Sequence, residues 1–276
     1  MTSTPIQESS ATLAFDRQAP VFDELYKADE IIRYKRKRVR DHMNSLLRAN
    51  SSILELNAGT GEDAVYFASL GHHVHATDIS PAMQEQLKKK VAGNGVEQHV
   101  TWELCSYTEL EKLASSGPYD HIFSNFAGLN CTAELSRVLD RFHSLLKPGG
   151  MVTLVVLPKF CLWEFMLLFR GKAGTAFRRF SGSRGTRAHI EGVHFRCWYY
   201  NPGYIRKHLD EQFVVRNLEG LCSIVPPSYM DRFATKYPVL FRRLVKWENR
   251  LKCAWPWRSM GDYYILSLQK KEEVQR

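Results

Sequence analysis

The sequence lacks any hydrophobic run long enough to cross a membrane as a helix, which takes about 18 apolar residues. The longest apolar stretch, FCLWEFMLLF at 160–169, is shorter and contains Glu164. The first residues, MTSTPIQESSATLAF, have neither the basic nor the apolar region of a signal peptide. We therefore expect a cytoplasmic protein, with membrane association, if any, limited to its periphery.

Cysteine pairs of the CxxC type are missing as well. Zinc sites and disulfide frameworks of small secreted domains show regular cysteine spacings, and this chain does not show them. We therefore expect reduced thiols at all six cysteines, which are Cys105, Cys131, Cys161, Cys197, Cys222 and Cys253.

Acidic residues are scarce in one half of the chain. Residues 1–150 carry 16 Lys/Arg and 19 Asp/Glu, a balance of −3, whereas residues 151–276 carry 22 and 10, a balance of +12. The net charge of +9 therefore belongs to the second half. This half either contacts an anionic partner or is a well-solvated basic surface.

Strand and helix patterns alternate along the first 158 residues, which predicts a mostly parallel, doubly wound α/β sheet of the Rossmann-like kind. Short β-branched runs mark the strands, and Ser80 followed by Pro81 marks a helix start. A last strand at 262–270, expected to be antiparallel, completes the sheet. The other expected strands are 52–56, 73–78, 99–105, 119–127, 151–158, 193–200 and 213–225.

A carboxylate precedes a glycine turn in SSILELNAGTGEDA at 51–64. GTGEDA fits the G-x-G-x-x-A pattern of dinucleotide sites, but a carboxylate at Glu55 would repel a phosphate. Asp78, at the end of the next strand, can accept both hydroxyls of a ribose. The backbone of Gly59 and Gly61 allows close approach because no Cβ intervenes. A ligand with a ribose and a positive group, such as S-adenosylmethionine (SAM), suits this arrangement.

At these residues the sequence resembles the class I SAM-dependent methyltransferases. LELNAGTGEDA is similar to the first motif of the family, VHATDIS to its acid-bearing second strand, and LLKPGG precedes a strand as it commonly does there. AFDRQAPVFDELY is similar to the N-terminal segment of the small-molecule branch that includes quinone methyltransferases. The resemblance covers about residues 15–158. Asn57 replaces the first glycine, and asparagine tolerates a positive φ.

The resemblance implies a role for particular residues. The methionine part of SAM would contact Glu55 and the turn, the ribose Asp78, and the methyl group the end of the fourth strand. Cys105-Ser106 stands where an acid often lies near the adenine, which leaves that contact open. The implied cofactor-binding residues are Glu55, Ala58, Gly59, Gly61, Asp78, Ile79, Met83, Ser106, Asn125, Phe126, Phe22 and Tyr26.

Composition and pattern, together with this resemblance, predict how the chain is divided. Residues 1–14 are expected to be a disordered tail before a single methyltransferase domain at 15–276. Within it we expect a helical cover at 15–50 and a SAM-binding core at 51–158. A mobile lid at 159–200, rich in Gly and Arg, would cap the acceptor. The final part, 201–270, would complete the sheet around a helical insertion at 228–258.

The end of the fourth strand limits which classes of methyl acceptor are expected. It ends in SNFA, without the tetrapeptide of enzymes that methylate base amines and without the acid of metal-dependent catechol-type enzymes, so we expect no metal. His194, with His189 as second candidate, is the predicted general base. Aromatic and basic residues after 158 predict an apolar or aromatic small-molecule acceptor with an anionic group, which lid arginines would meet: Arg178, Arg179, Arg184 and Arg187.

Two other functions remain open. The basic second half would also suit an RNA methyltransferase, although no RNA-binding module is recognisable and nucleic acid is not the expected partner. A SAM-binding protein without catalysis is the other reading, against which the complete set of Glu55, the glycines and Asp78 argues. The oligomeric state is left open.

Overall fold

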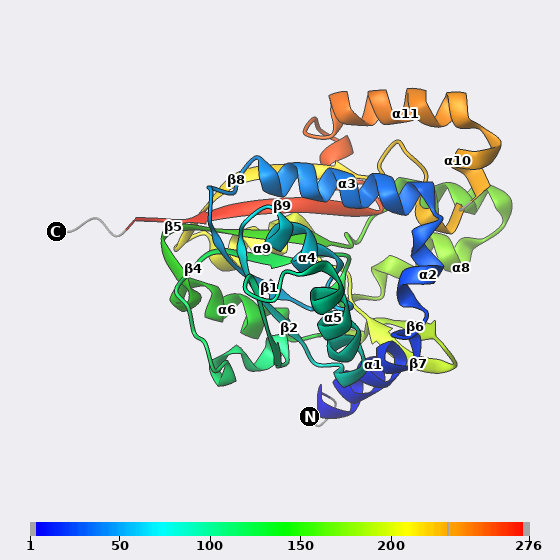
Figure 1. Cartoon of the computed structure of the whole chain (residues 1–276). Coiled ribbons are helices and arrows are strands. Elements are labelled where there is room, and N and C mark those ends of the chain that lie inside the picture. The colour runs from blue at the N-terminus through cyan, green and yellow to red at the C-terminus, as the bar shows by residue number, and fades with distance from the viewer. Residues whose placement is uncertain (1–3, 231, 273–276) are drawn as a thin grey trace.

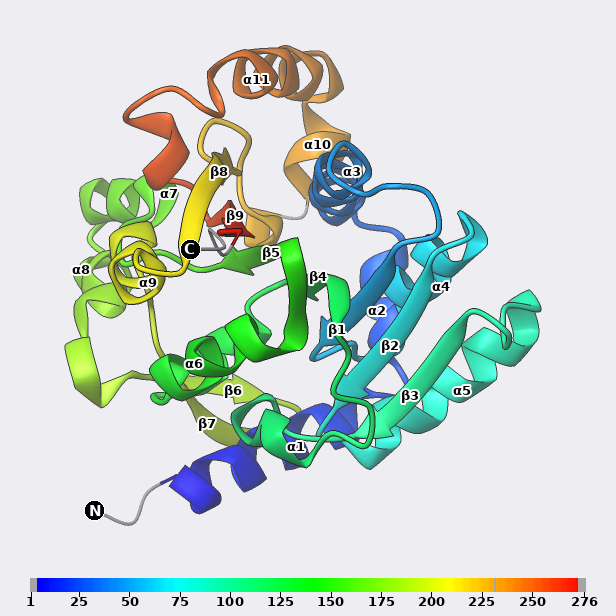
Figure 2. The ribbon, with the colours of Figure 1, turned by 90° about the vertical axis from the view of Figure 1, so that its left-hand side faces the viewer.

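The centre of the molecule is a seven-stranded sheet with the order β3-β2-β1-β4-β5-β9-β8 (Figures 1 and 2). The computed structural model describes residues 4–230 and 232–272. Neighbours from β3 to β5 are parallel, whereas β9 is antiparallel to both β5 and β8. The predicted Rossmann-like sheet with an antiparallel last strand is confirmed. The strands are β1 (Ser52–Leu56), β2 (His73–Asp78), β3 (Val100–Leu104), β4 (Tyr119–Ser124), β5 (Leu146–Val156), β8 (Phe213–Leu221) and β9 (Tyr263–Lys270).

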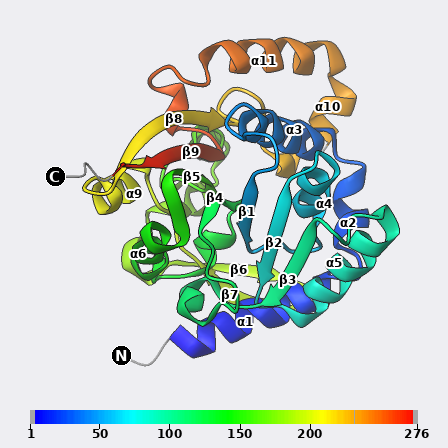
Figure 3. The same ribbon diagram turned by 60° about the vertical axis from the view of Figure 1, so that its left-hand side comes forward.

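Helices cover both faces of the sheet (Figure 3). One core lies between the sheet and α6 and α9, and includes Phe142 and Ile205. The other lies between the sheet and α3, α4 and α5, and includes Phe67 and Leu87. Strands buried on both faces explain the continuous apolar runs in the sequence. These helices are α3 (Glu30–Asn44), α4 (Glu62–Ser69), α5 (Pro81–Asn94), α6 (Leu135–Leu145) and α9 (Pro202–Leu209).

Local sequence signals set the ends of α5 as predicted. The Ser80 hydroxyl accepts a hydrogen bond from the amide of Met83, and Pro81 occupies the first turn. Gly95 closes the helix in the left-handed conformation with φ of 65°. The start of this helix is thereby fixed directly beside Asp78, at the carboxyl end of β2.

The predicted disordered tail at 1–14 needs correction from Thr4 onward. Residues Thr4–Gln18 form helix α1, which is followed by α2 (Phe22–Lys27). Ala11 and Ala14 of α1 are buried against Phe195 of a hairpin far along the chain. A polar helix of this kind is stabilised by tertiary packing, which its own sequence does not reveal.

The segment predicted as a lid, 159–200, folds into short helices and a two-stranded hairpin. The predicted strand at 193–200 is shorter and pairs with an unpredicted strand before it. Figure 1 shows this hairpin beside α1, at the same end of the molecule as α2 and α8. The elements are α7 (Leu162–Phe165), η3 (Met166–Arg170), α8 (Ala173–Phe177), η4 (Arg178–Phe180), η5 (Gly182–Arg184), β6 (Thr186–Ile190) and β7 (Val193–Cys197).

Two arginines anchor this segment instead of facing an acceptor. The Arg179 side chain is 2% exposed, and its Nη2 lies 2.5 Å from Glu164 Oε1 and 2.7 Å from Asp262 Oδ1. Arg178 forms two further hydrogen bonds with Glu164, of 2.7 and 2.6 Å. The expectation that Arg178 and Arg179 bind the anionic group of the acceptor is therefore corrected. Whether the segment moves as a lid stays a prediction.

The final part of the chain carries a helical insertion between β8 and β9, as predicted for 228–258. It packs against the outer side of α3 through Phe241 and Ala234. None of the helices in the described ranges is long and apolar enough to cross a membrane. The elements of the insertion are η6 (Ser228–Met230), α10 (Arg232–Lys236), α11 (Pro238–Leu251) and η7 (Trp257–Ser259), and the remaining short helices of the fold are η1 (Tyr107–Lys112) and η2 (Gly128–Cys131).

Candidate functional site

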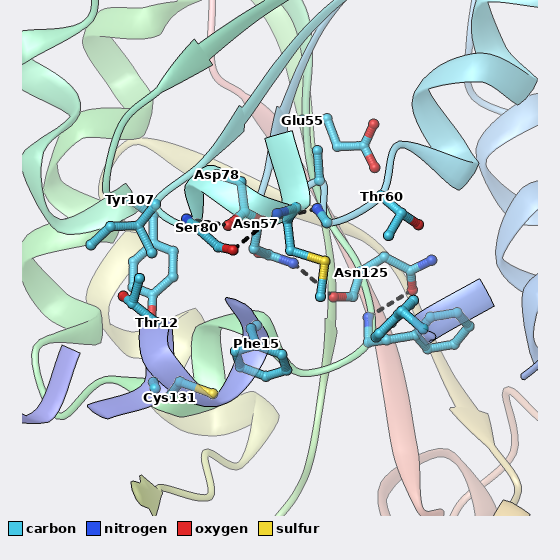
Figure 4. A pocket seen from close by; sticks show the side chains of 18 of the residues that line it. Thr12, Phe15, Glu55, Asn57, Thr60, Asp78, Ser80, Tyr107, Asn125 and Cys131 are labelled. Atoms are coloured by element: carbon cyan, nitrogen blue, oxygen red, sulfur yellow. Dashed lines mark hydrogen bonds between the residues drawn. The ribbon is translucent and has the colours of Figure 1, made fainter. Parts of the chain in front are cut away.

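A cavity lies at the carboxyl ends of β1, β2 and β4, where parallel α/β sheets bind ligands (Figure 4). We call it the first cavity. Ten of the thirteen predicted site residues line it, and these are Phe22, Glu55, Ala58, Gly59, Asp78, Ile79, Met83, Ser106, Asn125 and Phe126. Helix α1 closes the cavity with Glu8, Ala11, Thr12 and Phe15.

Glu55 is a buried carboxylate without a complete set of partners. Its side chain is 3% exposed, and Oε2 has no hydrogen-bond partner within the described residues. Burial raises its pKa well above the usual range, and Asp63 raises it further, while Arg40 and Arg36 oppose the shift. Leaving such a group unpaired costs about 1–3 kcal/mol or more. A cationic ligand group in the cavity would supply the missing partner.

The carboxylate and guanidinium groups beside Glu55 have partners of opposite charge. Asp63 accepts hydrogen bonds from Arg40 Nε at 2.7 Å and from Asn125 Nδ2 at 2.7 Å. Arg36 donates to Glu62 at 2.7 Å. Of these carboxylates, Glu55 is therefore the one with an oxygen that lacks a hydrogen-bond partner among the described residues, and Arg36 Nε also lacks one.

Asp78 ends β2 and holds the glycine turn. Its Oδ2 accepts a hydrogen bond from the Gly59 amide at 2.8 Å, and its Oδ1 accepts one from the Ser80 amide at 2.9 Å. Burial raises the pKa of Asp78, and these backbone hydrogen bonds act against the rise. Each carboxylate oxygen keeps a second lone pair, so the fixed side chain can also accept hydroxyl groups from a ligand.

The turn between β1 and α4 uses three positive φ angles. Asn57 adopts φ of 49°, Gly59 57° and Gly61 79°. Asn57 thus adopts the positive φ that its sequence position predicts, and its side chain donates to Asn125 O at 3.0 Å and accepts from Ser124 Oγ at 2.6 Å. The side-chain position of Gly59 is open, with nothing within 4 Å of an added Cβ. A ligand can therefore approach the backbone there.

Gly61 serves packing, since it does not line the first cavity. A Cβ at this position would lie 2.7 Å from Leu87 Cγ, so α4 could not begin so close to α5. With φ of 79° the residue also has a conformation that side chains disfavour. Gly61 supports the turn and does not itself face a ligand.

His194, the predicted base, faces away from the cavities. Along β7 the side chains alternate, and Phe195 is buried while His194 is exposed. The His194 ring lies 4.6 Å from that of His189 on the paired strand, so the second candidate points to the same outer face. The sequence could identify the strand but not which of its faces would pack against α1. Neither histidine lines the first cavity or the neighbouring cavity described below.

Residues of α1 are the main site residues that the sequence did not identify. The Glu8 carboxylate accepts hydrogen bonds from Thr108 Oγ1 at 2.7 Å and from Ser106 Oγ at 3.4 Å, at the edge of the first cavity. Tyr107 also lines the cavity. The signal that could have revealed α1 is its small-residue face, Ala11 and Ala14, in a segment without glycine.

A second cavity adjoins the first, and Phe15, Phe22, Arg36, Phe126, Gly128 and Cys131 line both. Tyr26, predicted to cover the cofactor, lines this second cavity, with its ring 4.9 Å from that of Phe22. Most other walls are apolar and come from α3, the β6–β7 hairpin, β9 and the segments after β4 and β5: Ile32, Ala127, Leu157, Ala188, Ile190, Phe195 and Tyr263.

Lys35 brings a buried positive charge to the second cavity. It is 4% exposed, its Nζ donates to Ser228 Oγ at 3.0 Å, and it lies 4.8 Å from the centre of the Tyr263 ring. The carboxylate nearest to it is that of Asp262, whose Oδ2 lies 3.9 Å away and whose Oδ1 binds Arg179. The neutralisation of Lys35 is therefore weaker than that of Arg179. An anionic ligand group would complete it.

Reduced thiols were predicted, and no metal was expected. All six cysteines are free, in agreement with the expectation of reduced thiols. Among the described residues, Cys161, Glu164 and Asp262 lie together, with ligand atoms within 4.8 Å of one another. Because the Arg179 guanidinium already binds both carboxylates, this cluster is the anchor of the 159–200 segment.

Part of the chain is similar in sequence to known methyltransferases. A family model described as a methyltransferase domain matches residues 53–150. The demethylmenaquinone methyltransferase of Clavibacter sepedonicus is 32% identical over 106 residues, which are 38% of this chain and 41% of that protein. The tRNA 5-carboxymethoxyuridine methyltransferase of Escherichia coli K12 is 28% identical over 103 residues, 37% of this chain and 39% of that protein. The chain thus spans about two fifths of these relatives.

Solved structures share the fold over a greater length. A Burkholderia thailandensis 1,6-didemethyltoxoflavin-N1-methyltransferase with bound S-adenosylhomocysteine has a TM-score of 0.56 at 15% identity, covering 99% of this chain and 92% of that one. A Streptomyces coelicolor geranyl diphosphate C-methyltransferase has a TM-score of 0.56 at 14% identity, covering 86% and 80%. At such identities the likeness establishes the fold.

Proposed function

We propose that this chain, which belongs to the class I SAM-dependent methyltransferase family, transfers a methyl group from SAM to a small apolar or aromatic acceptor that carries an anionic group. The observation that carries the cofactor assignment is the unpartnered Oε2 of Glu55 in a cavity that also contains Asp78. A ligand with an ammonium group and a ribose fits both carboxylates.

The cofactor-binding roles follow from the first cavity. Glu55 would bind the ammonium of the methionine part, and Asp78 the ribose hydroxyls. Gly59, with open space at its Cβ position, leaves room for the ligand along the backbone. Ile79, Met83 and Ser106 line the same cavity and would enclose the adenine. SAM supplies a methyl group on a sulfonium, which is an electrophile.

The acceptor would occupy the second cavity. Its aromatic and aliphatic walls suit an apolar body, because such sites usually combine apolar walls with a few placed polar groups. Lys35 is the placed group, and an anionic substituent would lie against its Nζ. Phe126 and Cys131 line both cavities and would therefore lie between the cofactor and the acceptor.

Positioning is the main contribution that these residues can make to the reaction. Holding a nucleophile close to an electrophile and aligned with it is worth about 7–11 kcal/mol of the barrier. Phe15, Phe22 and Phe126 would exclude water from the junction of the cavities. An acceptor whose reacting atom belongs to the ionised group has no proton to lose there and needs no general base, and Lys35 would favour that ionised form. The outward-facing His194 is then not required.

RNA is the second candidate acceptor, since one relative acts on tRNA and the chain is basic. The second cavity favours a small molecule, because its apolar walls offer few partners to a phosphate backbone. Incubation with SAM labelled in the methyl group, first with a small-molecule extract and then with total RNA, tests the choice. We expect label in an organic-extractable, anion-exchange-retained product. Label in RNA alone would overturn the acceptor class, and no transfer to either despite SAM binding would indicate a non-catalytic SAM-binding protein.

A further inference from the structure

Helices α10 and α11 lie on the outer side of α3 (Figures 1 and 2). Their sequence carries a concentrated positive charge. Between residues 232 and 258 there are eight Lys/Arg and one acidic residue, Glu248. Glu248 is fully buried and accepts hydrogen bonds from the amides of Cys222, Ile224 and Val225. The carboxylate therefore holds the loop after β8 and does not neutralise the outer surface.

The basic side chains of α11 lie in one row along the helix, which we call its crest. Arg243, Lys246 and Arg250 follow at intervals of three and four residues, which places them on one face. This face is opposite to the one that packs on α3 through Phe241 and Glu248. All three side chains are exposed.

Large apolar side chains lie beside this crest and are exposed too. Val239 is 54% exposed, Leu240 45% and Trp247 56%. Trp255, in the turn after α11, is 79% exposed. Exposed apolar groups cost free energy in water, and a contiguous set of them marks a contact surface.

A groove joins α11 to the segment that caps the acceptor side. Trp247 and Leu251 form one wall, and Leu162, Trp163 and Met166 form the other. Phe169, which follows in η3, is 84% exposed. The apolar surface therefore extends from α11 across to η3. We call Arg243, Lys246, Arg250, Trp247, Trp255, Met166 and Phe169 the α11 surface.

We propose that the α11 surface docks on the anionic face of a lipid bilayer. Lysine and arginine at such a surface are attracted to anionic headgroups, and tryptophan prefers the zone between headgroups and acyl chains. A helix with basic residues on a crest and apolar residues on its flank has the composition of an interfacial helix. Nucleic acid would match the charge but would leave Val239, Leu240 and Phe169 without an apolar environment. The docking needs no methyl transfer and stands apart from the proposed function.

Co-sedimentation of the full-length protein with vesicles, without SAM or acceptor, tests the docking. We expect binding to phosphatidylcholine vesicles that contain phosphatidylglycerol, little binding to pure phosphatidylcholine, and loss of binding at raised salt. The double variant R243E/K246E should lower the partition coefficient by at least about tenfold. Trp247→Ala should lower it less and should remove part of the blue shift of tryptophan fluorescence on binding.

A matched control changes the same charge elsewhere. R206E/K207E alters two exposed residues of α9, on the other side of the sheet, and should leave vesicle binding nearly unchanged. Equal loss in both double variants would overturn the site, and absence of binding to anionic vesicles at low salt would overturn the docking. If light scattering shows a dimer that Trp247→Ala dissociates, the surface binds a second copy of the chain. If the protein binds RNA but not vesicles, and R243E/K246E loses the RNA binding, the surface binds nucleic acid. Either result rejects the proposal.

Discussion

The first cavity and the second cavity adjoin each other, but they are built from different kinds of sequence. The first is mainly made by turns that directly follow β1, β2 and β4, so its residues lie close to short motifs. The second brings together α1, α2, α3, the end of β5, the β6–β7 hairpin and Ser228. Local motifs therefore specify the cofactor side, and long-range packing specifies the acceptor side.

Their electrostatics differ in the same way. The first cavity holds Glu55 with an unpartnered oxygen, and the second holds Lys35 with a distant, shared carboxylate. A cationic group suits the first and an anionic group the second. The two cavities should therefore respond separately to substitution, and the following experiments test that separation.

The largest effect is expected for Asp78→Ala. Loss of charge-assisted hydrogen bonds to two ribose hydroxyls, each worth about 1.5–3 kcal/mol, should weaken SAM binding about a hundredfold in calorimetry. Asp78→Asn, which keeps the size of the side chain, should weaken it about tenfold. Asp41→Ala removes an exposed carboxylate paired with Lys37 and serves as the control. Unchanged affinity in a folded Asp78→Ala protein would remove the ribose assignment.

Lys35→Met tests the acceptor side alone. The variant keeps an unbranched apolar stem but loses the ammonium, so the KM of an anionic acceptor should rise about tenfold or more. The dissociation constant of SAM should stay the same, because Lys35 does not line the first cavity. Lys37→Met, on the exposed side of the same helix, is the matched control. A parallel loss of SAM affinity would show that the cavities are not separate.

The pH dependence of SAM binding is a smaller effect. Because burial and Asp63 raise the pKa of Glu55, the free protein holds a proton there at pH values above the ordinary carboxyl pKa. A bound ammonium favours the ionised form, so binding should release this proton and strengthen as pH rises through the raised pKa. Calorimetry in buffers of different ionisation enthalpy measures the release. Proton uptake would contradict the assignment of Glu55.

The smallest effect is expected for His194→Ala. Since the imidazole is exposed and lies beside the tilted ring of His189 outside both cavities, kcat/KM should change by less than about twofold. A loss of a hundredfold or more, the usual size for a general base, would restore the role that the sequence suggested.

The strands and the cofactor motifs could be predicted because each has a local cause. Alternation predicts the sheet, Ser80 caps α5, and Asn57 tolerates the positive φ that the turn requires. Helix α1 could not be predicted, since its polar sequence is stabilised by contacts with residues 180 positions away or more, such as Phe195 with Ala11 and Ala14. The roles of Arg179 and His194 could not be predicted from the sequence either. The partners of Arg179 include Asp262, far along the chain, and the outward face of His194 depends on which side of β7 meets α1.

Glu55→Gln provides the most direct measurement, with affinity and stability determined on the same protein. Glutamine keeps the shape but removes the buried carboxylate. Because the raised pKa of Glu55 lowers the stability of wild type as pH rises above the ordinary carboxyl pKa, the variant should unfold at a higher temperature than wild type near neutral pH. Its SAM affinity should fall at least about tenfold, while Glu97→Gln, at an exposed position, changes neither. A destabilised variant that binds SAM as tightly as wild type would contradict the account.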